Sequence, residues 1–134
     1  MRTHRVLVVE DDVDIRESLV EALEEHGYEV IAVANGREAL DVLHAGGPAP
    51  CLILLDLMMP TLDGRGFREQ QLKDAALASI PVIVLSAYRD VAADVEPMRV
   101  AGFLRKPVRL EDLIGAATRH CPRTGPCDVG GAPA

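Results

Sequence analysis

The chain has 134 residues, which is enough for one domain of ordinary size. Hydrophobic residues make up 49% and charged residues 26%, a balance typical of globular proteins that excludes the disordered and fibrous classes. Aromatic residues are only 3% and the net charge is −7, which argues against a nucleic-acid-binding surface, where aromatic and positive side chains are needed.

The sequence contains neither a long apolar stretch nor a secretion signal. No run approaches the ~18 apolar residues of a membrane helix, and the N-terminus passes directly into acidic residues without a cleavage pattern. We therefore expect a cytoplasmic protein. The three cysteines, Cys51, Cys121 and Cys127, are irregularly spaced, so we expect no disulfide framework.

Short apolar runs alternate with helical patterns along the chain. The first run, residues 6–9, is apolar throughout, as in a strand buried on both faces. Ile15, Leu19 and Leu23 then repeat with helical spacing, and Gly27 ends that helix. The same patterns predict further strands at 28–33, 51–55, 82–85 and 103–105, and further helices near 36–43, 65–78 (with a less regular apolar face), 110–117 and over part of 88–101.

Five strands that alternate with five helices predict an α/β fold, with a parallel sheet and helices on both of its faces. We place this domain at residues 4–120. Residues 121–134 are rich in proline and glycine and lack apolar periodicity, so we expect them to form a flexible C-terminal tail.

Polar side chains follow four of the predicted strands, at the point where each strand ends. The acidic run Glu10-Asp11-Asp12 follows the first strand, Asp56 the third, Ser86 the fourth and Lys106 the fifth. Ligands of open parallel sheets bind outside the carboxyl ends of the strands, so we expect these side chains to converge at one edge of the sheet.

Several carboxylates at one edge repel one another, by about 3 kcal/mol per pair at ~5 Å and an effective dielectric constant of ~20. A hard divalent cation removes this repulsion, and oxygen-only ligands favour Mg²⁺ over zinc or copper. A carboxylate beside Mg²⁺, a lysine and a hydroxyl group is equipped to attack phosphorus and to hold the phosphoryl group that it gains.

Taken singly, most of these residues also have a structural interpretation. Asp11 and Asp12 are candidates for helix N-caps, Ser86 for a turn residue, and Lys106 for a solvated surface lysine. Asp56 is harder to explain in this way, because an aspartate that ends an apolar strand needs a partner when it is buried. The functional interpretation depends on all of these residues meeting at one edge of the sheet.

In order and spacing, these residues resemble the signature of response-regulator receiver domains. The resemblance covers roughly residues 4–120 and includes the run from Asp56 to Pro60 with Gly64 after it, Ser86-Ala87 and Lys106-Pro107, a peptide often cis in the family. It implies a flavodoxin-like sheet with strand order 2-1-3-4-5 and a stand-alone phosphoacceptor similar to chemotaxis regulators. The chain departs from the family pattern in its short loop before Phe103 and in Pro97, which lies where the fourth helix is expected.

The resemblance further implies how the acidic residues act. Asp56 would accept a phosphoryl group from a histidine kinase or a histidine phosphotransfer protein. Mg²⁺ would be bound by Asp12 and Asp56, by Asp11 partly through water, and by the carbonyl oxygen of Met58.

The remaining implied residues bind the phosphoryl group or report its presence. Ser86 and Lys106 would bind the phosphoryl oxygens, and Ser86 and Phe103 would be the switch residues, with Phe103 rotating inward on activation. The protein would then be a switch with only weak self-catalysed phosphotransfer and dephosphorylation, not an enzyme. It would bind a downstream protein through its fourth helix, fifth strand and fifth helix, as a monomer or a phosphorylation-dependent dimer.

Three other functions compete with this one. A hydrolase of the haloacid-dehalogenase type needs a second aspartate two positions after the nucleophile, where this chain has Met58. A flavodoxin would have a phosphate-binding loop after its first strand, whereas the three acidic residues found here would repel phosphate. A receiver-like module that binds partners without phosphorylation is the alternative that the sequence leaves open.

Overall fold

The computed structural model describes residues 4–46, 49–57, 62–87 and 98–120. The expected tail over 121–134, Met58, Pro97 and most of the predicted helix over 88–101 lie outside these described residues.

Five strands form one parallel sheet. They are β1 (Arg5–Val9), β2 (Glu29–Val33), β3 (Leu52–Asp56), β4 (Val82–Ser86) and β5 (Gly102–Arg105). The strands lie in the order β2-β1-β3-β4-β5, and every neighbouring pair is parallel. The predicted α/β fold and its flavodoxin-like strand order are therefore confirmed.

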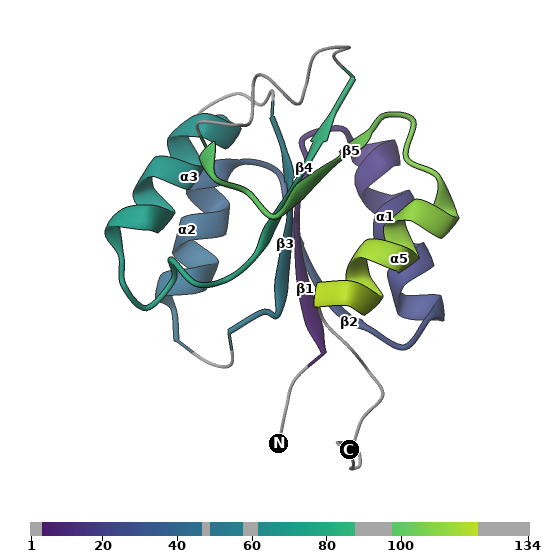
Figure 1. Cartoon of the computed structure of the whole chain (residues 1–134), viewed down its shortest axis with the longest axis horizontal. Helices are drawn as coiled ribbons and strands as arrows, with labels where there is room; N and C mark the ends of the chain where they lie inside the picture. The colour runs from purple at the N-terminus through teal and green to yellow at the C-terminus, as the bar shows by residue number, and fades with distance from the viewer. Residues whose placement is uncertain (1–3, 47–48, 58–61, 88–97, 121–134) are drawn as a thin grey trace.

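Helices cover both faces of this sheet. Within the described residues they are α1 (Val13–Glu25), α2 (Gly36–His44), α3 (Gly64–Lys73) and α5 (Leu110–His120). Figure 1 shows α1 and α5 on one side of the sheet and α2 and α3 on the other. None of the helices in the described part of the chain is long and apolar enough to cross a membrane.

Polar side chains define where three of the helices begin. The residues Asp12, Asn35 and Asp63 each adopt an extended conformation and accept a hydrogen bond from the backbone N–H three residues later. Such N-caps satisfy one of the backbone N–H groups that the first turn of a helix leaves without a partner.

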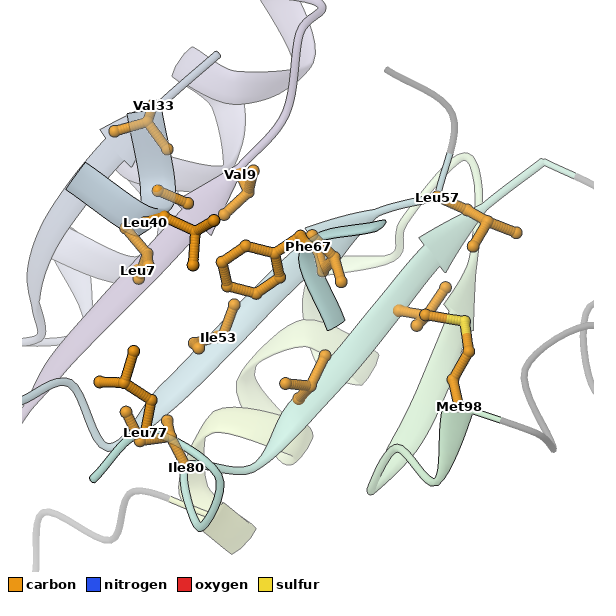
Figure 2. Close-up of a cluster of buried hydrophobic side chains, with 14 residues drawn as sticks. Leu7, Val9, Val33, Leu40, Ile53, Leu57, Phe67, Leu77, Ile80 and Met98 are labelled. Carbon is orange, nitrogen blue, oxygen red and sulfur yellow. The ribbon is translucent and has the colours of Figure 1, made fainter. Parts of the chain in front are cut away.

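The centre of the sheet is buried on both faces. Every residue of β3 and β4 is buried, which explains why the sequences of these strands are continuous apolar runs up to their last residue. One hydrophobic cluster packs against α2 and α3, and Figure 2 shows Phe67 of α3 lying among Leu7, Leu40 and Ile53. A second cluster joins the other face to α1 and α5. These two hydrophobic clusters fix the sheet between the helices, and with it the carboxyl ends of the strands.

α3 ends five residues earlier than the sequence predicts. The helix stops at Lys73, because Asp74 forms a turn in which its Oδ1 accepts the N–H of Ala76 at 2.9 Å. The carbonyl oxygen of Asp74 also accepts the N–H groups of Leu77 and Ala78. An aspartate that bonds to the nearby backbone competes with helix formation, so the apolar residues after Asp74 belong to a turn.

Cys51, which immediately precedes β3, is disulfide-bonded. The other two cysteines lie outside the described residues. One bonded cysteine does not make a disulfide framework, so the expectation of no framework stays a prediction. The bond at Cys51 itself could not be predicted, since spacing in the sequence does not show which sulfur atoms are close in space.

Candidate functional site

The carboxyl ends of four strands meet at one edge of the sheet. Glu10 directly follows β1, Asp56 and Ser86 end β3 and β4, and Lys106 directly follows β5. A cavity of about 380 Å³ lies at this edge, lined by Glu10, Asp11, Asp12, Ile15, Asp56, Ser86, Ala87 and Lys106. The residues that the sequence places at the strand ends therefore share one cavity.

Lys106 lies between two buried carboxylates. Its Nζ atom is 2.9 Å from Glu10 Oε1 and 3.1 Å from Asp56 Oδ1. Glu10 is 0% exposed and Asp56 is 4% exposed, so both ion pairs are shielded from bulk water, where opposite charges attract one another less strongly.

A backbone hydrogen bond connects Ser86 to Lys106. The Lys106 N–H donates to the Ser86 carbonyl oxygen at 2.9 Å, and the Ser86 side chain is buried at the wall of the cavity. The Lys106-Pro107 peptide bond that follows is cis, in agreement with the resemblance.

Burial raises the pKa of Asp56 from 3.8 to about 7. The negative charge of Glu10 and a hydrogen bond with Asp11 add to this rise, whereas the positive charge of Lys106 opposes it. Burial lowers the pKa of Lys106, but its hydrogen bond to Glu10 and the charge of Asp56 outweigh this effect and raise that pKa above 10.5. The positive charge of Lys106 therefore offsets only part of what burial and Glu10 cost the ionised form of Asp56.

An acidic cluster completes the cavity. Carboxylate oxygens of Glu10, Asp11 and Asp56 all lie within 4.8 Å of one another. Glu10 and Asp56 are buried and Asp11 is exposed, so the cluster can be reached from solvent on the Asp11 side. A donor set of oxygens alone, with room for water, fits a hard divalent cation such as Mg²⁺, which would also relieve the repulsion among the carboxylates.

Asp12 lies at the rim of the cavity but outside this cluster. Its Oδ1 accepts the N–H of Ile15 at 3.1 Å and caps α1. The structure thus gives Asp12 the capping role considered for it in the sequence, and Asp12 is not among the three residues of the acidic cluster. Its predicted role as a Mg²⁺ ligand stays a prediction.

The sequence places Glu10 at this edge with the rest of the acidic run, but it does not single out Glu10 as a member of the metal-binding set. β1 and β3 pair with Val9 opposite Leu55, so the residue after Val9 lies next to Asp56. Three hydrogen bonds hold Glu10 there. Its N–H donates to the Val33 carbonyl, its carbonyl accepts from Arg16 Nη1, and its side-chain Oε2 accepts the N–H of Asp12. The signal that identifies Glu10 is therefore the strand register, which a run of three acidic residues does not reveal.

Gly64 sets the shape of the backbone behind Asp56. It is the first residue of α3, and its N–H donates to the Leu57 carbonyl oxygen at 3.1 Å. A Cβ atom at this position would lie 2.8 Å from the Asp56 carbonyl oxygen and 3.0 Å from Leu57 Cα. Glycine is needed here because the helix approaches the end of β3 too closely for any side chain.

Phe103, the predicted switch residue, is not among the residues that line the cavity. Phe103 lies on the edge strand β5 and is 39% exposed, so its side chain is partly on the surface in this conformation. Met58 lies outside the described residues.

Comparison with known proteins agrees with this geometry. Residues 6–118 match the response regulator receiver domain family. The response regulator MprA of Mycolicibacterium vanbaalenii is 39% identical over 134 residues, which cover 95% of this chain and 54% of the relative. The chain spans about half the length of the curated relatives it matches.

Solved structures give the same result. The signal receiver domain of a signal transduction histidine kinase from Syntrophus aciditrophicus is 34% identical, with a TM-score of 0.78 over 87% of this chain and 89% of that one. The Mn²⁺-bound form of the response regulator Rcp1 is 30% identical, with a TM-score of 0.70 over 86% of this chain and 89% of that one. One protein of similar structure has thus been crystallised with a bound divalent cation.

Proposed function

The chain belongs to the response regulator receiver domain family, and on that premise we propose that Asp56 accepts a phosphoryl group from a histidine kinase or a histidine phosphotransfer protein. The single observation that supports this most strongly is the placement of Asp56. Its carboxylate ends a fully buried strand, lies 3.1 Å from Lys106 Nζ and shares a cavity with Ser86. A carboxylate with a raised pKa at a strand end that opens into a cavity is typical of a functional site.

The transfer requires the ionised form of Asp56. One carboxylate oxygen forms a bond to phosphorus while the bond from phosphorus to the donor imidazole nitrogen breaks, and the imidazole then takes a proton from solvent. The product is an acyl phosphate on Asp56, with negative charge on its remaining oxygens. The reaction modifies the protein itself, so the domain is a phosphoacceptor switch with only weak catalysis of its own phosphotransfer and dephosphorylation.

Lys106 and Ser86 are placed to bind the new group. The Lys106 ammonium already binds Asp56 Oδ1, and it can bind a phosphoryl oxygen from the same position. The Ser86 hydroxyl is at the end of the neighbouring strand β4, within the same cavity. We propose that these two groups hold the phosphoryl oxygens and that Ser86, with Phe103, passes the change to the surface.

The acidic cluster is the proposed Mg²⁺ site. Asp11 and Asp56, with Glu10 beside them, supply the carboxylate oxygens that would hold the ion. When bound, Mg²⁺ would neutralise part of the charge on the incoming phosphoryl group. Glu10 replaces Asp12 in this proposal because Asp12 caps α1.

We further propose how the switch is used. The phosphorylated domain would bind a downstream protein in the cytoplasm through the face that includes β5 and α5, where Phe103 is partly exposed. The domain would act either as a monomer or as a dimer that forms on phosphorylation.

Intact-mass spectrometry with acetyl phosphate as a small phosphoryl donor tests the proposal. The wild-type chain should gain the mass of one phosphoryl group when Mg²⁺ is present and none when it is chelated. Asp56→Asn should gain none, and Asp41→Asn, at an exposed position on α2, should behave like the wild type. No gain in the wild type would favour a partner-binding module that acts without phosphorylation, and a gain in Asp56→Asn would place the acceptor elsewhere.

A further inference from the structure

Two polar side chains occupy the buried face of α3, remote from the acidic cavity. Arg68 is 7% exposed and Gln71 is 0% exposed. They are three residues apart, a spacing that places them on the same side of a helix. Burying a guanidinium group costs its hydration, and burial lowers the pKa of Arg68. Such a residue needs hydrogen-bond partners at this position.

Arg68 donates hydrogen bonds to residues 98 and 99, which lie just before β5 in the chain. Its Nε donates to the Met98 carbonyl oxygen at 2.9 Å, and its Nη2 donates to the Arg99 carbonyl oxygen at 2.8 Å. Successive carbonyl groups of an extended chain alternate in direction. Arg99 has a φ of 56°, in the left-handed region that residues with side chains rarely adopt, and this turn allows both carbonyls to meet one guanidinium. The Met98 side chain is fixed as well, because it packs in the hydrophobic cluster shown in Figure 2.

Gln71 extends the network to the segment that leads into β4. Its Oε1 accepts from Arg68 Nη1 at 2.7 Å. Its Nε2 donates to the carbonyl oxygens of Leu77 at 2.8 Å and Ile80 at 3.1 Å. The side-chain amide is therefore satisfied on both sides. We call Arg68, Gln71 and the four carbonyl groups they bind the α3 polar network.

The α3 polar network thus holds the starts of two strands whose opposite ends contribute to the cavity. β4 ends at Ser86, and Lys106 directly follows β5. β5 needs such a support more than β4 does, because it is an edge strand of four residues that pairs with β4 alone. The same helix begins at Gly64, against the backbone of Asp56. α3 therefore contacts both the acceptor strand and the segment that leads to Lys106.

We propose that Arg68 is a positioning residue, which holds the start of β5 against α3 and thereby sets the position of Lys106 at the far end of that strand. An apolar residue at position 68 would fill the space without the cost of burying a charge, but it would leave the Met98 and Arg99 carbonyls without the donors they have here. The consequence for phosphorylation rests on the proposed function of Asp56, whereas the positioning of β5 does not.

Amide hydrogen exchange tests the positioning directly. Arg68→Met keeps a long apolar side chain and removes the donors, and Lys73→Met changes an exposed residue of the same helix as a control. In Arg68→Met, protection of the β5 amides should fall by about tenfold more than protection of the β3 amides. Equal losses in β3 and β5 would overturn the proposal, because Arg68 would then stabilise the whole fold, and so would unchanged protection in β5. Arg68→Lys retains a charged donor, should fold if Arg68→Met does not, and should show the same selective loss to a smaller extent.

The rate of phosphorylation gives a second, separate readout. In Arg68→Met, the rate with acetyl phosphate and Mg²⁺ should fall roughly threefold or more, because a displaced Lys106 binds the phosphoryl oxygens less well. Arg68→Lys should recover part of the rate, and Lys73→Met should keep all of it. A wild-type rate in Arg68→Met would contradict the link to Lys106. If the wild type accepts no phosphate at all, the proposed function fails, but the exchange experiment still decides whether Arg68 positions β5.

Discussion

The carboxylate of Asp56 is only 4% exposed, and Glu10 and Asp11 offer oxygens within 4.8 Å of its own. Folding removes this carboxylate from water and places it beside two other acids, which raises the free energy of its charged form. The ion pair with Lys106 at 3.1 Å offsets only part of this cost. The stability of the cation-free fold should therefore depend on the charge of this one residue.

The first consequence is a pH dependence. Because folding raises the pKa of Asp56 from 3.8 to about 7, the folded protein retains a proton between these values that the unfolded chain has released. The free energy of unfolding therefore falls as pH rises through this window. Asp56→Asn should be more stable than the wild type by about 1–3 kcal/mol at pH 8 with Mg²⁺ chelated, and this advantage should shrink toward zero near pH 4.

Urea denaturation at the two pH values measures this difference. Asp41→Asn, on the exposed side of α2, is the control and should show no comparable gain at either pH. An advantage of Asp56→Asn that is the same at both pH values would mean that the pKa of Asp56 is not raised by folding.

The acidic run after β1 gives a second prediction, because its members have different roles. Asp11→Asn removes a carboxylate of the cluster and should weaken Mg²⁺ binding by about tenfold, or ~1.4 kcal/mol. Asp12→Asn should leave Mg²⁺ binding close to that of the wild type, and it should not lower stability either, since asparagine is as good an N-cap as aspartate. The rise in melting temperature on adding Mg²⁺ measures both effects. A large loss of response in Asp12→Asn, with a normal response in Asp11→Asn, would restore Asp12 as the ligand.

At the scale of helices and strands, apolar patterns predict most of the structure. The continuous runs in β1, β3 and β4 identify buried parallel strands because these strands are covered on both faces. The end of α3 could not be predicted from apolar residues, because the side chain of Asp74 ends the helix by bonding to the backbone. The irregular apolar face of the same helix has a specific cause, which is the buried pair Arg68 and Gln71.

Two glycines in helices, Gly64 of α3 and Gly115 of α5, should change the free energy of unfolding in opposite directions when each is replaced by alanine. Gly64→Ala should lower the free energy of unfolding by about 1–3 kcal/mol, because the new Cβ would lie 2.8 Å from the Asp56 carbonyl oxygen. Gly115→Ala in α5 should raise it by roughly 0.5–1 kcal/mol, since among the described residues no atom beyond its chain neighbours and the nearby backbone of α5 lies within 4 Å of its Cβ position, and alanine favours the helix.

Urea denaturation compares the two variants under the same conditions. Because Gly64 contacts the backbone of Asp56 at the end of β3, we also expect Gly64→Ala to slow the proposed phosphorylation of Asp56, and Gly115→Ala to leave it unchanged. Equal stability of the two variants would mean that the backbone behind Asp56 moves aside easily, contrary to the close approach described for Gly64.

At the scale of the whole molecule, the parallel sheet brings together residues that are far apart in the sequence. Asp56, Ser86 and Lys106 could be grouped from the sequence, because parallel strands place their carboxyl ends at one edge. The strand order came only from the resemblance to a known family. The sequence left open which of the three acidic residues after β1 join the cluster and which one caps α1, because this depends on the register between β1 and β3 and on where α1 begins.

The central claim is that Asp56 is the residue that accepts phosphate, and its most direct test is to locate the phosphoryl group in the chain. Borohydride reduces an acyl phosphate to an alcohol, so a phosphorylated aspartate becomes homoserine, which peptide mass spectrometry can place. After treatment with acetyl phosphate and Mg²⁺, we expect homoserine at position 56 alone, and none when Mg²⁺ is chelated. Homoserine at position 11, 12 or 63, or none under any condition, would contradict the claim.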